Sequence, residues 1–534
     1  MTKPRDLATL GGGFIQSGTG ATLRTVENKL KDTVSVKDFG AVGDGVADDT
    51  AAIQAAINTG KSVLFGPGGT YMVTGNISVS TNNQKIYGDG TIKKLGTSIA
   101  HLFALSDSIT NVWFDGLTFD GTRASFASGN AVSAIFGYIN TNITVTNCTF
   151  QNIIDCGIKL RDSAGLTAIG NRFTNVAQNG IELRVYANDP RTGLPYLSRP
   201  TINGNHRIIG NHFSKIDDGL SGAGDGCGVT FDSIAANYPI TNTVVSDNTF
   251  EDVLRSIWTE NNVSGSEAQN VVVKGNSIRG NLAGSGTIKT KDGIGLIGVQ
   301  GAVVEGNTIL NVGNFTPVGG ECAGVQVSMA STRDVVIANN VIQDLTGAAI
   351  RTDYCINVAA GERIIIKNNI TRGASDGQIR LVTANTAQVE IAGNIGAEDE
   401  YSWGQPISLA LTRQNIPANT GIIYFYPFGW TDDTDFIMPS VGKLVGMSVK
   451  LSAAISAGTI TITPYAGATS LTNLSIVSAD FGGGTGAYKK IASINGTLIG
   501  LGTRISVRAT TDASFAPTTN DALVMLIFDA SVKD

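Results

Sequence analysis

A short unit of alternating apolar and polar positions recurs through the middle of the chain. Each copy contains two or three apolar residues, a Gly, Asn or Asp, usually an Asn, and then a Phe or Ile. The closing or equivalent positions lie 23 to 40 residues apart, at Phe119, Phe150, Phe173, Phe213, Phe250, Ile278, Ile309, Ile342 and Thr371. A unit of this length with strand-like alternation predicts the coils of a parallel β-helix, in which each coil stacks on the next.

The asparagine of this unit is expected at the same corner in coil after coil. Its copies are Asn171, Asn211, Asn248, Asn276, Asn307, Asn340 and Asn369. Asn tolerates the left-handed backbone conformation, and its side chain can bond neighbouring backbone groups. We therefore interpret these residues as structural.

A second apolar strand follows each unit. Its central residues are Ile158, Ile181, Val229, Ile257, Ile294, Val325, Ile350 and Ile379. The offset from the preceding unit is 8 positions in two coils but 16 in three others, which indicates insertions at one corner. Insertions gathered on one side of a repeat protein often border its binding face. A further insertion adds Tyr186, Arg191, Tyr196 and Arg199 to this region.

The two ends of the repeat carry different patterns. Residues 48–57 predict a short amphipathic helix, capped by Asp48, Asp49 or Thr50, that would cover an open sheet end. After about residue 400 the Asn repeat stops, and short alternating strands with Gly- and Asn-rich turns predict an antiparallel β-sandwich. The fold class is therefore all-β.

Composition agrees with many short strands and excludes several partners. Gly accounts for 66 of 534 residues, and charged residues are only 15%, against about 25% in an average protein. The net charge is −6 and no run of Lys or Arg occurs, so we expect neither nucleic acid nor a membrane as partner. No secretion signal is apparent, and the five scattered cysteines are expected to be small, buried and reduced.

The start of the chain resembles a known superfamily. Residues 35–57 read SVKDFGAVGDGVADDTAAIQAAI, and KSVLFGPGGTYMVTGNISV follows a few residues later. This stretch is similar to the opening of pectate-lyase-like right-handed β-helices. With the preceding GGGFIQSGTGATLRTVENKLKDTVSVKDFGAVGDG it looks like the phage tailspike depolymerases, over roughly residues 10 to 95.

The resemblance implies an organisation and a biological setting. It implies a neck or attachment segment at 1–34, a β-helix with a catalytic groove at 35–403, and a trimerising or glycan-binding sandwich at 404–534. The expected assembly is a homotrimer on a virion tail, made in the host cytoplasm and held by the phage tail, its baseplate or another tailspike. The expected ligand is a bacterial capsular or O-antigen polysaccharide, and neither a cofactor nor a metal is expected.

Carboxylates on the second strands are the candidate catalytic groups. If these strands stack in register, two outward columns form. One contains Lys159, Glu182, Thr230, Trp258, Gln326, Arg351 and Arg380, and the other contains Arg161, Arg184, Asp232, Glu260, Ser328 and Asp353. Acids on adjacent coils would fall within the roughly 5–10 Å that separates the two carboxyl groups of glycosidases. We predict Glu260 as the acid and Asp232 or Glu182 as the base or nucleophile.

Neighbouring side chains suggest how a sugar would be held. Trp258 could offer a flat face to a sugar ring, Tyr186 lies in the nearby insertion, and Arg161, Arg184 and Arg351 could bind acidic sugar carboxylates. Asp217 and Asp218 are a reserve catalytic pair, and otherwise turn residues. They faintly resemble the paired aspartates of polygalacturonases, but the Gly-His-Gly element of that family is missing.

Three alternatives remain open from the sequence. A polysaccharide lyase of the same fold would need a base and a cation near the substrate carboxylate, for which Lys159 and Arg161 are candidates. A glycan-binding adhesin would need no catalytic carboxylate. The acids and arginines could also form solvated charge ladders without a role in catalysis.

Overall fold

The structure is a computed structural model that divides into two compact units. The described residues are 13–126, 130–194, 203–216, 226–261, 263–280, 291–313, 322–345, 352–382, 386–396, 407–413, 423–427, 436–437, 442–477, 480, 488–493, 498–499, 503–516 and 521–529. Unit 1 comprises Met1–Glu390 and Gly396–Glu398, and unit 2 comprises Ile391–Ile395 and Asp399–Asp534.

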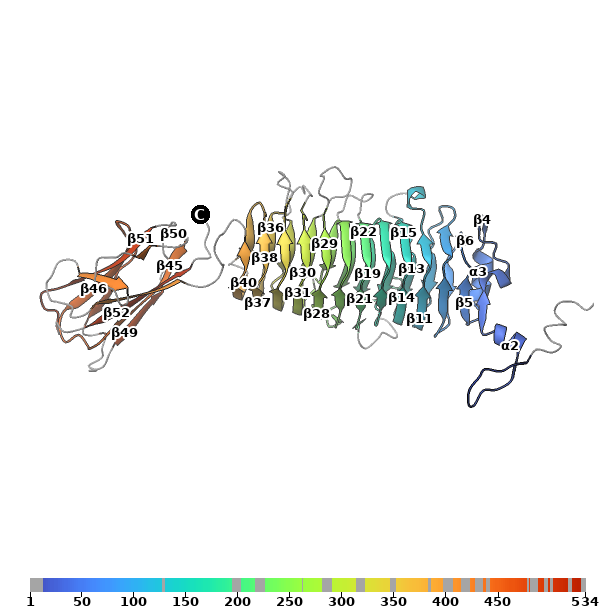
Figure 1. The fold of residues 1–534 in the computed structure, drawn as a ribbon, viewed down its shortest axis with the longest axis horizontal. Helices are drawn as coiled ribbons and strands as arrows, with labels where there is room; N and C mark the ends of the chain where they lie inside the picture. The colour runs from blue at the N-terminus through green and yellow to red at the C-terminus, as the bar shows by residue number, and fades with distance from the viewer. Residues whose placement is uncertain are drawn as a thin grey trace, which may run out of the picture. The chain divides into compact units, whose positions relative to one another are not determined.

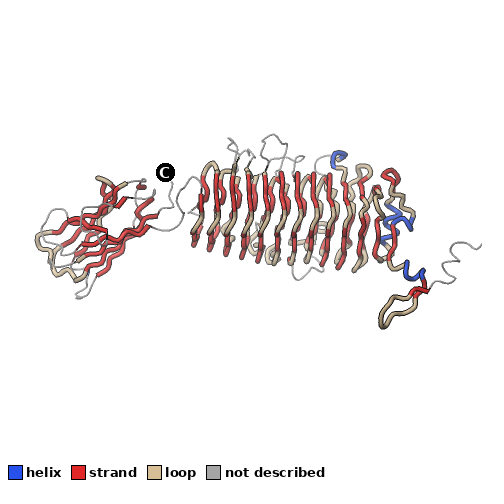
Figure 2. Tube along the Cα trace, viewed as in Figure 1, coloured by secondary structure: helices blue, strands red, loops and turns tan. Residues whose placement is uncertain are grey.

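Unit 1 is a solenoid of three parallel sheets, to which successive coils add one strand each (Figures 1 and 2). Sheet I consists of β7 (Ile77–Val79), β10 (Phe103–Leu105), β13 (Ile135–Tyr138), β16 (Ile158–Arg161), β19 (Asn179–Val185), β23 (Cys227–Ser233), β27 (Arg255–Thr259), β30 (Asp292–Ile297), β33 (Ala323–Ser328), β36 (Tyr354–Val358) and β39 (Gly377–Leu381). This confirms the predicted parallel β-helix.

Sheet II precedes sheet III in each coil. Sheet II consists of β3 (Thr33–Ser35), β5 (Ser62–Phe65), β8 (Lys85–Gly88), β11 (Thr110–Asp115), β14 (Thr141–Thr146), β17 (Thr167–Ile169), β20 (Asn203–Gly204), β21 (Arg207–Ile209), β24 (Ile240–Thr241), β25 (Val244–Ser246), β28 (Ala268–Lys274), β31 (Val299–Glu305), β34 (Arg333–Ala338), β37 (Gly361–Lys367) and β40 (Thr386–Ala392). Sheet III consists of β4 (Asp44–Asp48), β6 (Thr70–Val73), β9 (Thr91–Lys94), β12 (Thr118–Asp120), β15 (Thr149–Ile153), β18 (Arg172–Val176), β22 (His212–Ile216), β26 (Thr249–Val253), β29 (Ser277–Arg279), β32 (Thr308–Leu310), β35 (Val341–Gln343), β38 (Ile370–Arg372) and β41 (Ile395–Gly396).

Short elements precede and cover the first coils. A hairpin of β1 (Gly13–Phe14) and β2 (Arg24–Thr25) leads into the helix α2 (Val26–Leu30) and the 3-10 turn η1 (Val36–Phe39). The predicted helix is α3 (Thr50–Ile57), which lies at the N-terminal end of the solenoid and buries Ile53, Ala56 and Ile57 (Figure 1). Its N-cap residue is Asp49, whose side chain makes no capping bond, and the preceding Asp48 accepts a hydrogen bond from the Thr50 backbone N–H at 3.0 Å. A second 3-10 turn, η2 (Arg123–Ser125), follows β12.

A ladder of phenylalanines fills the interior beside sheet III. Phe119, Phe150, Phe173, Phe213 and Phe250 stack with ring centroids 4.6 to 4.9 Å apart. The facing position just before each sheet I strand centre is Gly157, Gly180 and Gly228 in three successive coils. A Cβ there would lie 2.6 to 2.7 Å from the ring of Phe173, Phe213 or Phe250. Glycine is therefore needed because the backbone approaches the rings closely.

The repeated asparagines form the predicted corner, with one correction. All seven are buried, and the Nδ2 of each of the first six donates to the Oδ1 of the asparagine in the next coil at 2.9 to 3.0 Å. The left-handed residue, however, is the one before each asparagine: Gly170, Gly210, Asp247, Gly275, Gly306, Asn339 and Asn368. The asparagine is required for its side-chain bonds, and its neighbour makes the turn.

The predicted centres of the second strand are confirmed in seven coils and wrong in one. Ile158, Ile181, Val229, Ile257, Ile294 and Val325 are successive Cα partners in sheet I. The next partner is Ile356 of β36, followed by Ile379. Ile356, not Ile350, is therefore the strand centre in this coil, and Ile350 lies outside the described residues.

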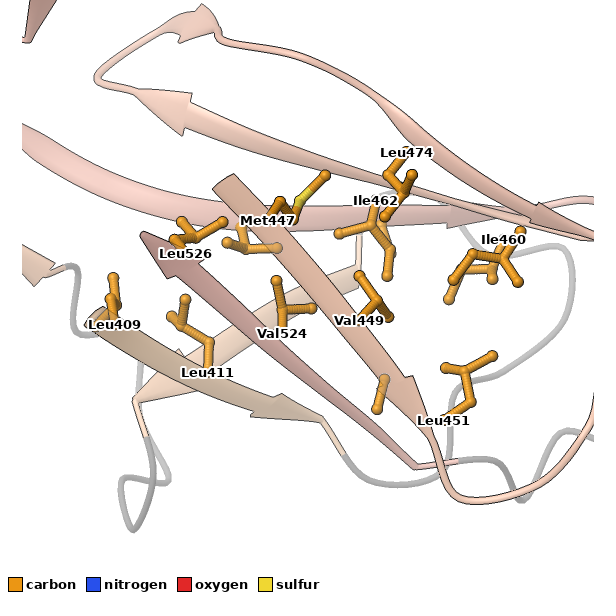
Figure 3. Close-up of a cluster of buried hydrophobic side chains, with 14 of the residues drawn as sticks. Leu409, Leu411, Met447, Val449, Leu451, Ile460, Ile462, Leu474, Val524 and Leu526 are labelled. Atoms are coloured by element: carbon orange, nitrogen blue, oxygen red, sulfur yellow. The ribbon is translucent and has the colours of Figure 1, made fainter. Parts of the chain in front are cut away.

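Unit 2 is an antiparallel sheet that folds over its own core, which confirms the predicted sandwich. Its strands are β42 (Ile407–Arg413), β43 (Ile423–Pro427), β44 (Phe436–Ile437), β45 (Gly442–Leu451), β46 (Thr459–Ala466), β47 (Thr469–Ser470), β48 (Leu474–Val477), β49 (Tyr488–Ser493), β50 (Leu498–Ile499), β51 (Arg504–Thr511) and β52 (Ala522–Asp529). Side chains of β42, β45 and β52 pack against those of β46 and β48 (Figure 3). Among the described residues of the chain, no helix is long and apolar enough to cross a membrane.

Candidate active site

The predicted site residues gather on the outer face of sheet I, over β16, β19, β23 and β27. One column of Cα partners is Lys159, Glu182, Thr230 and Trp258, and the next is Arg161, Arg184 and Asp232. The intervening side chains, such as Ile181 and Leu183, are buried in the core. Because side chains alternate along a strand, both columns point outward. Over these four coils the register is as predicted.

Glu182 on β19 lies between two cations. It is 3% exposed, with Oε2 at 3.7 Å from Lys159 Nζ and Oε1 at 3.8 Å from Arg161 Nη2. Oε2 accepts a hydrogen bond from Asn179 Nδ2 at 3.1 Å. Oε1 has no hydrogen-bond partner among the described residues. That oxygen is therefore the better placed of the two to accept a proton.

Asp232 on β23 is equally buried, at 3% exposed. Arg184 binds both oxygens of the Asp232 carboxylate. Its Nε lies 3.0 and 2.8 Å from Oδ1 and Oδ2, and its Nη2 lies 2.8 Å from Oδ2. Burial, helped by the charges of Glu182 and Glu260, raises the pKa of Asp232 to about 6 against the lowering effect of Arg184. A carboxyl group with this pKa is substantially protonated near pH 6 and can act as an acid.

Glu260 immediately follows the last residue of β27 and is exposed. Its charge raises the pKa of Asp232, so the two carboxyl groups interact, as predicted from their adjacent coils. The apolar burial that keeps an acid protonated surrounds Asp232 instead. Asp232, and not Glu260, therefore has the buried environment expected of a carboxyl group that stays protonated.

Asp155 is a member of the cluster that the sequence reasoning missed. It is fully buried, its carboxylate accepts hydrogen bonds from Lys159 Nζ at 2.9 and 3.1 Å, and Ser133 Oγ donates to it at 2.6 Å. It precedes β16 and lies outside both columns, so the spacing of four residues from Lys159 was its only signal. Burial alone would lower the pKa of Lys159, but the charges of Cys156, Glu182 and Asp155 raise it well above its usual value.

Arg161 lies among aromatic rings. Its guanidinium carbon is 5.1 Å from the ring centroid of Tyr186 and 5.7 Å from those of Phe136 and Tyr138. Nη1 donates to the Tyr138 hydroxyl at 3.0 Å. Tyr186 thus reaches the site as predicted. Tyr138 was missed, although it is the Cα partner of Arg161 and extends the same column by one coil.

Trp258 occupies its predicted position, but its ring is packed against protein. It is 8% exposed, and the Arg255 guanidinium carbon lies 4.5 Å from its ring centroid. A Cβ on Gly295 would lie 2.1 Å from Trp258 Cε3, so the glycine makes room for the ring. The flat face that we expected to hold a sugar is therefore occupied by protein groups.

Three predicted residues, Asp217, Asp218 and Arg351, lie outside the described residues, as do Tyr196 and Arg199. The register of sheet I nevertheless corrects the column position given to Arg351, because Asn357 is the partner of Gln326 and Arg380. Asp353 also departs from its column, since it precedes β36 and accepts a hydrogen bond from the Cys322 backbone N–H at 2.7 Å. Within the described part of the chain, no group of three or more His, Cys, Asp or Glu could hold a metal ion.

The chain is similar to carbohydrate-active and viral proteins. A rhamnogalacturonase A/epimerase, pectate lyase-like family model matches residues 33–109, and a right handed beta helix region model matches residues 201–395. A mannuronan C5-epimerase of Azotobacter vinelandii is 38% identical over 125 residues, covering 20% of this chain and 12% of the epimerase. The tail spike protein of Shigella phage Sf6 is 32% identical over 165 residues, covering 30% of this chain and 24% of that protein.

This chain therefore matches less than a quarter of the length of either relative. A solved structure of a mutant of the tailspike protein of E. coli bacteriophage HK620 has a TM-score of 0.50 at 14% identity, and the match covers 98% of each chain. At that identity the match supports the fold alone. Together with the three parallel sheets, the right handed beta helix model identifies the chain as a right-handed β-helix protein, similar to pectate-lyase-like proteins over residues 33–109 and to phage tailspikes in part of its sequence.

Proposed function

We propose that this protein is a phage tailspike that binds a bacterial surface polysaccharide on the outer face of sheet I and hydrolyses it. The similarity to a phage tail spike protein supports the setting. One observation supports the chemistry: two carboxyl groups, Glu182 and Asp232, lie nearly buried on adjacent strands, and the pKa of Asp232 is about 6. Its place would be the virion tail, where we expect a homotrimer.

The two carboxyl groups have different surroundings, as glycoside hydrolysis requires. We assign Asp232 as the acid that protonates the leaving oxygen. Glu182, beside Lys159 and Arg161 and with Oε1 free of hydrogen bonds from described residues, is the base or nucleophile. Glu260, the residue that the sequence favoured as acid, becomes an accessory that raises the pKa of Asp232.

A lyase that uses Lys159 as its base is the weaker alternative. The ammonium group is fixed by Asp155, and its pKa is raised, so the neutral amine that could remove a proton is scarce near neutral pH. Lys159 is better suited to hold Glu182 in place.

The test is degradation of a panel of purified capsular and O-antigen polysaccharides, following reducing ends, ultraviolet absorbance of unsaturated products, and fragment masses. Reducing ends with masses increased by water would support hydrolysis. Unsaturated, water-deficient fragments would establish a lyase, an unchanged chain length with altered sugars would indicate an epimerase, and tight binding without change would leave an adhesin.

Three variants then test the residue assignment on the polymer that is cleaved. Asp232→Asn and Glu182→Gln should each lower kcat by about 10²- to 10⁴-fold, the usual contribution of an acid or base. Glu260→Gln should have a much smaller effect. The control is Glu251→Gln, an exposed carboxylate on β26 in sheet III. Full activity of Asp232→Asn would refute the assignment.

A further inference from the structure

We infer that the glycan bound over β16, β19, β23 and β27 is uncharged, lacking uronic or sialic acid carboxylates in the segment that contacts this face. The inference rests on the proposed function and names the class of substrate. It depends on how the cations of this face are already used, and it replaces the acidic sugar that the sequence suggested for Arg161 and Arg184.

Two arginines hold carboxylates of the protein itself. Arg184 binds both oxygens of Asp232 through Nε and Nη2. Arg191, whose guanidinium carbon lies 4.3 Å from the ring centroid of Tyr138, donates Nε and Nη2 to Asp189 at 2.6 to 3.1 Å. Its Nη1 and Nη2 also donate to the two oxygens of Asp107 at 2.8 and 2.7 Å. All three nitrogens of Arg191 and the Nε–Nη2 edge of Arg184 are therefore already bound to carboxylates of the protein.

Two further cations are enclosed. Lys159 is 6% exposed and holds Asp155. The Arg161 side chain is 18% exposed, with one nitrogen on the Tyr138 hydroxyl and another 3.8 Å from Glu182. A sugar carboxylate that displaced Lys159 from Asp155 would leave that buried carboxylate without its cation. One that drew Arg161 away would remove one of the two cations beside Glu182.

The charge balance of this region is negative. The five cations, Lys159, Arg161, Arg184, Arg191 and Arg255, face seven carboxyl groups: Asp107, Asp155, Glu182, Asp189, Asp232, Glu260 and Asp292. Even with Asp232 protonated, the described carboxylates outnumber the described cations. An anionic sugar would meet repulsion and would lose water without gaining a fresh cationic partner.

Groups suited to an uncharged sugar lie beside these pairs. The rings of Phe136 and Tyr186 are half-buried and flank Arg161, and His101 stacks on Phe136 at 4.1 Å between centroids. Aromatic rings bind the apolar faces of sugars without requiring a charge. The adjacent carboxylates and the Tyr138 hydroxyl can hydrogen-bond sugar hydroxyls, which makes a neutral polymer the better complement.

The experiment measures binding of the full-length protein carrying Glu182→Gln, to prevent turnover, to matched polysaccharides at 50 and 500 mM salt. The probes are neutral O-antigen polysaccharides, uronate-containing capsules, and the same capsules after chemical reduction of their carboxyl groups. We expect a neutral O-antigen to bind with an affinity that changes less than about threefold with salt. Any capsule that binds should do so at least as well after reduction.

Each other result has a distinct meaning. An acidic capsule whose affinity drops tenfold or more on carboxyl reduction, or on raising salt, would overturn the uncharged-substrate inference and leave the proposed function intact. Failure of the folded wild-type protein to bind any polysaccharide would overturn the proposed function itself.

A charge-altered variant gives a second measurement. Asp107→Asn removes one carboxylate from Arg191 and should improve binding of an acidic capsule. The control is Asp334→Asn, at an exposed ion pair on sheet II, which should not change this binding.

Discussion

Asp232 combines an arginine held at both oxygens with almost complete burial, and the two influences oppose each other. Burial prevails, so the carboxyl group has a pKa of about 6. The sequence predicted that Glu182, Asp232 and Glu260 would share one face, because alternation and coil spacing determine register. It named Glu260 as the acid, whereas we propose Asp232, because burial depends on side chains from several coils and could not be inferred from register alone.

The pH dependence of turnover should report Asp232 directly. An acid must be protonated to work, so kcat/KM should fall as the pH rises through about 6. In Asp232→Asn the residual activity should lack this fall. A wild-type profile that stays flat between pH 5 and 8 would exclude Asp232 as the acid.

The buried pair of Lys159 and Asp155 should contribute to the stability of the fold, because removing one partner leaves the other charge buried and unpaired. Lys159→Met is expected to lower the free energy of unfolding by about 3–5 kcal/mol, measured by chemical denaturation. Adding Asp155→Asn should recover much of the loss.

Lys85→Met is the matched control, since Lys85 and Asp115 form a partly exposed pair with side chains 42% and 33% exposed. It should cost at most about 1 kcal/mol. If the two lysine variants lost equal free energy of unfolding, burial of the Lys159–Asp155 pair would not increase its contribution to stability.

At the scale of elements, two ladders hold the coils in register. The pattern located the asparagines but assigned them the left-handed turn, which the preceding residue makes. A sequence shows that two residues suited to turns are adjacent, but not which of them adopts the left-handed backbone conformation. The displaced centre at Ile350 has a similar cause: both Ile350 and Ile356 sit in apolar stretches, and only pairing with Val325 decides between them.

The buried asparagines of the ladder should contribute more to the free energy of unfolding than the exposed residues beside them. Asn276→Ala removes hydrogen bonds to the asparagines and backbone of adjacent coils and leaves buried groups unpaired. We expect a loss of about 1–3 kcal/mol in the free energy of unfolding. The neighbouring exposed Ser277, changed to Ala, should be within about 0.5 kcal/mol of wild type.

The phenylalanine ladder depends on its facing glycines. In Gly180→Ala the new methyl group would lie 2.6 Å from the Phe213 ring, and overpacking of this kind costs about 1–3 kcal/mol. Ser256→Ala is the comparison, because Ser256 occupies the same register position two coils on and already carries a Cβ. If Gly180→Ala were as stable as the wild type, the phenylalanine rings would be able to move aside without a loss in the free energy of unfolding.

At the scale of the whole molecule, each of the two units has its own hydrophobic core among the described residues. The solenoid core runs through unit 1, and the sandwich core consists of residues from Leu409 to Phe528. Composition and alternation were sufficient to predict both architectures, because each has its own spacing of strands and turns. The roles of unit 2, in trimerisation or in glycan binding, remain our proposals.

Separate cores should give separate unfolding events. Calorimetry of the full-length protein is expected to show two transitions, and Leu526→Ala, a buried residue of β52, should lower only one. The expected cost is about 2–5 kcal/mol. The matching change in unit 1, Ile257→Ala, should lower the other. If either variant shifted both transitions equally, the two units would unfold as one.

Long connections run from sheet III to sheet I in five coils, from β12 to β13, β22 to β23, β29 to β30, β32 to β33 and β35 to β36, and another runs from sheet I to sheet II, from β19 to β20. The two ladders that fix coil stacking lie elsewhere, in the interior and at the asparagine corner between sheets II and III. Sequence change in these connections would therefore leave both ladders intact. Under the proposed function, a tailspike of this fold can change its connections as the host polysaccharide changes, while the residues of the ladders stay the same.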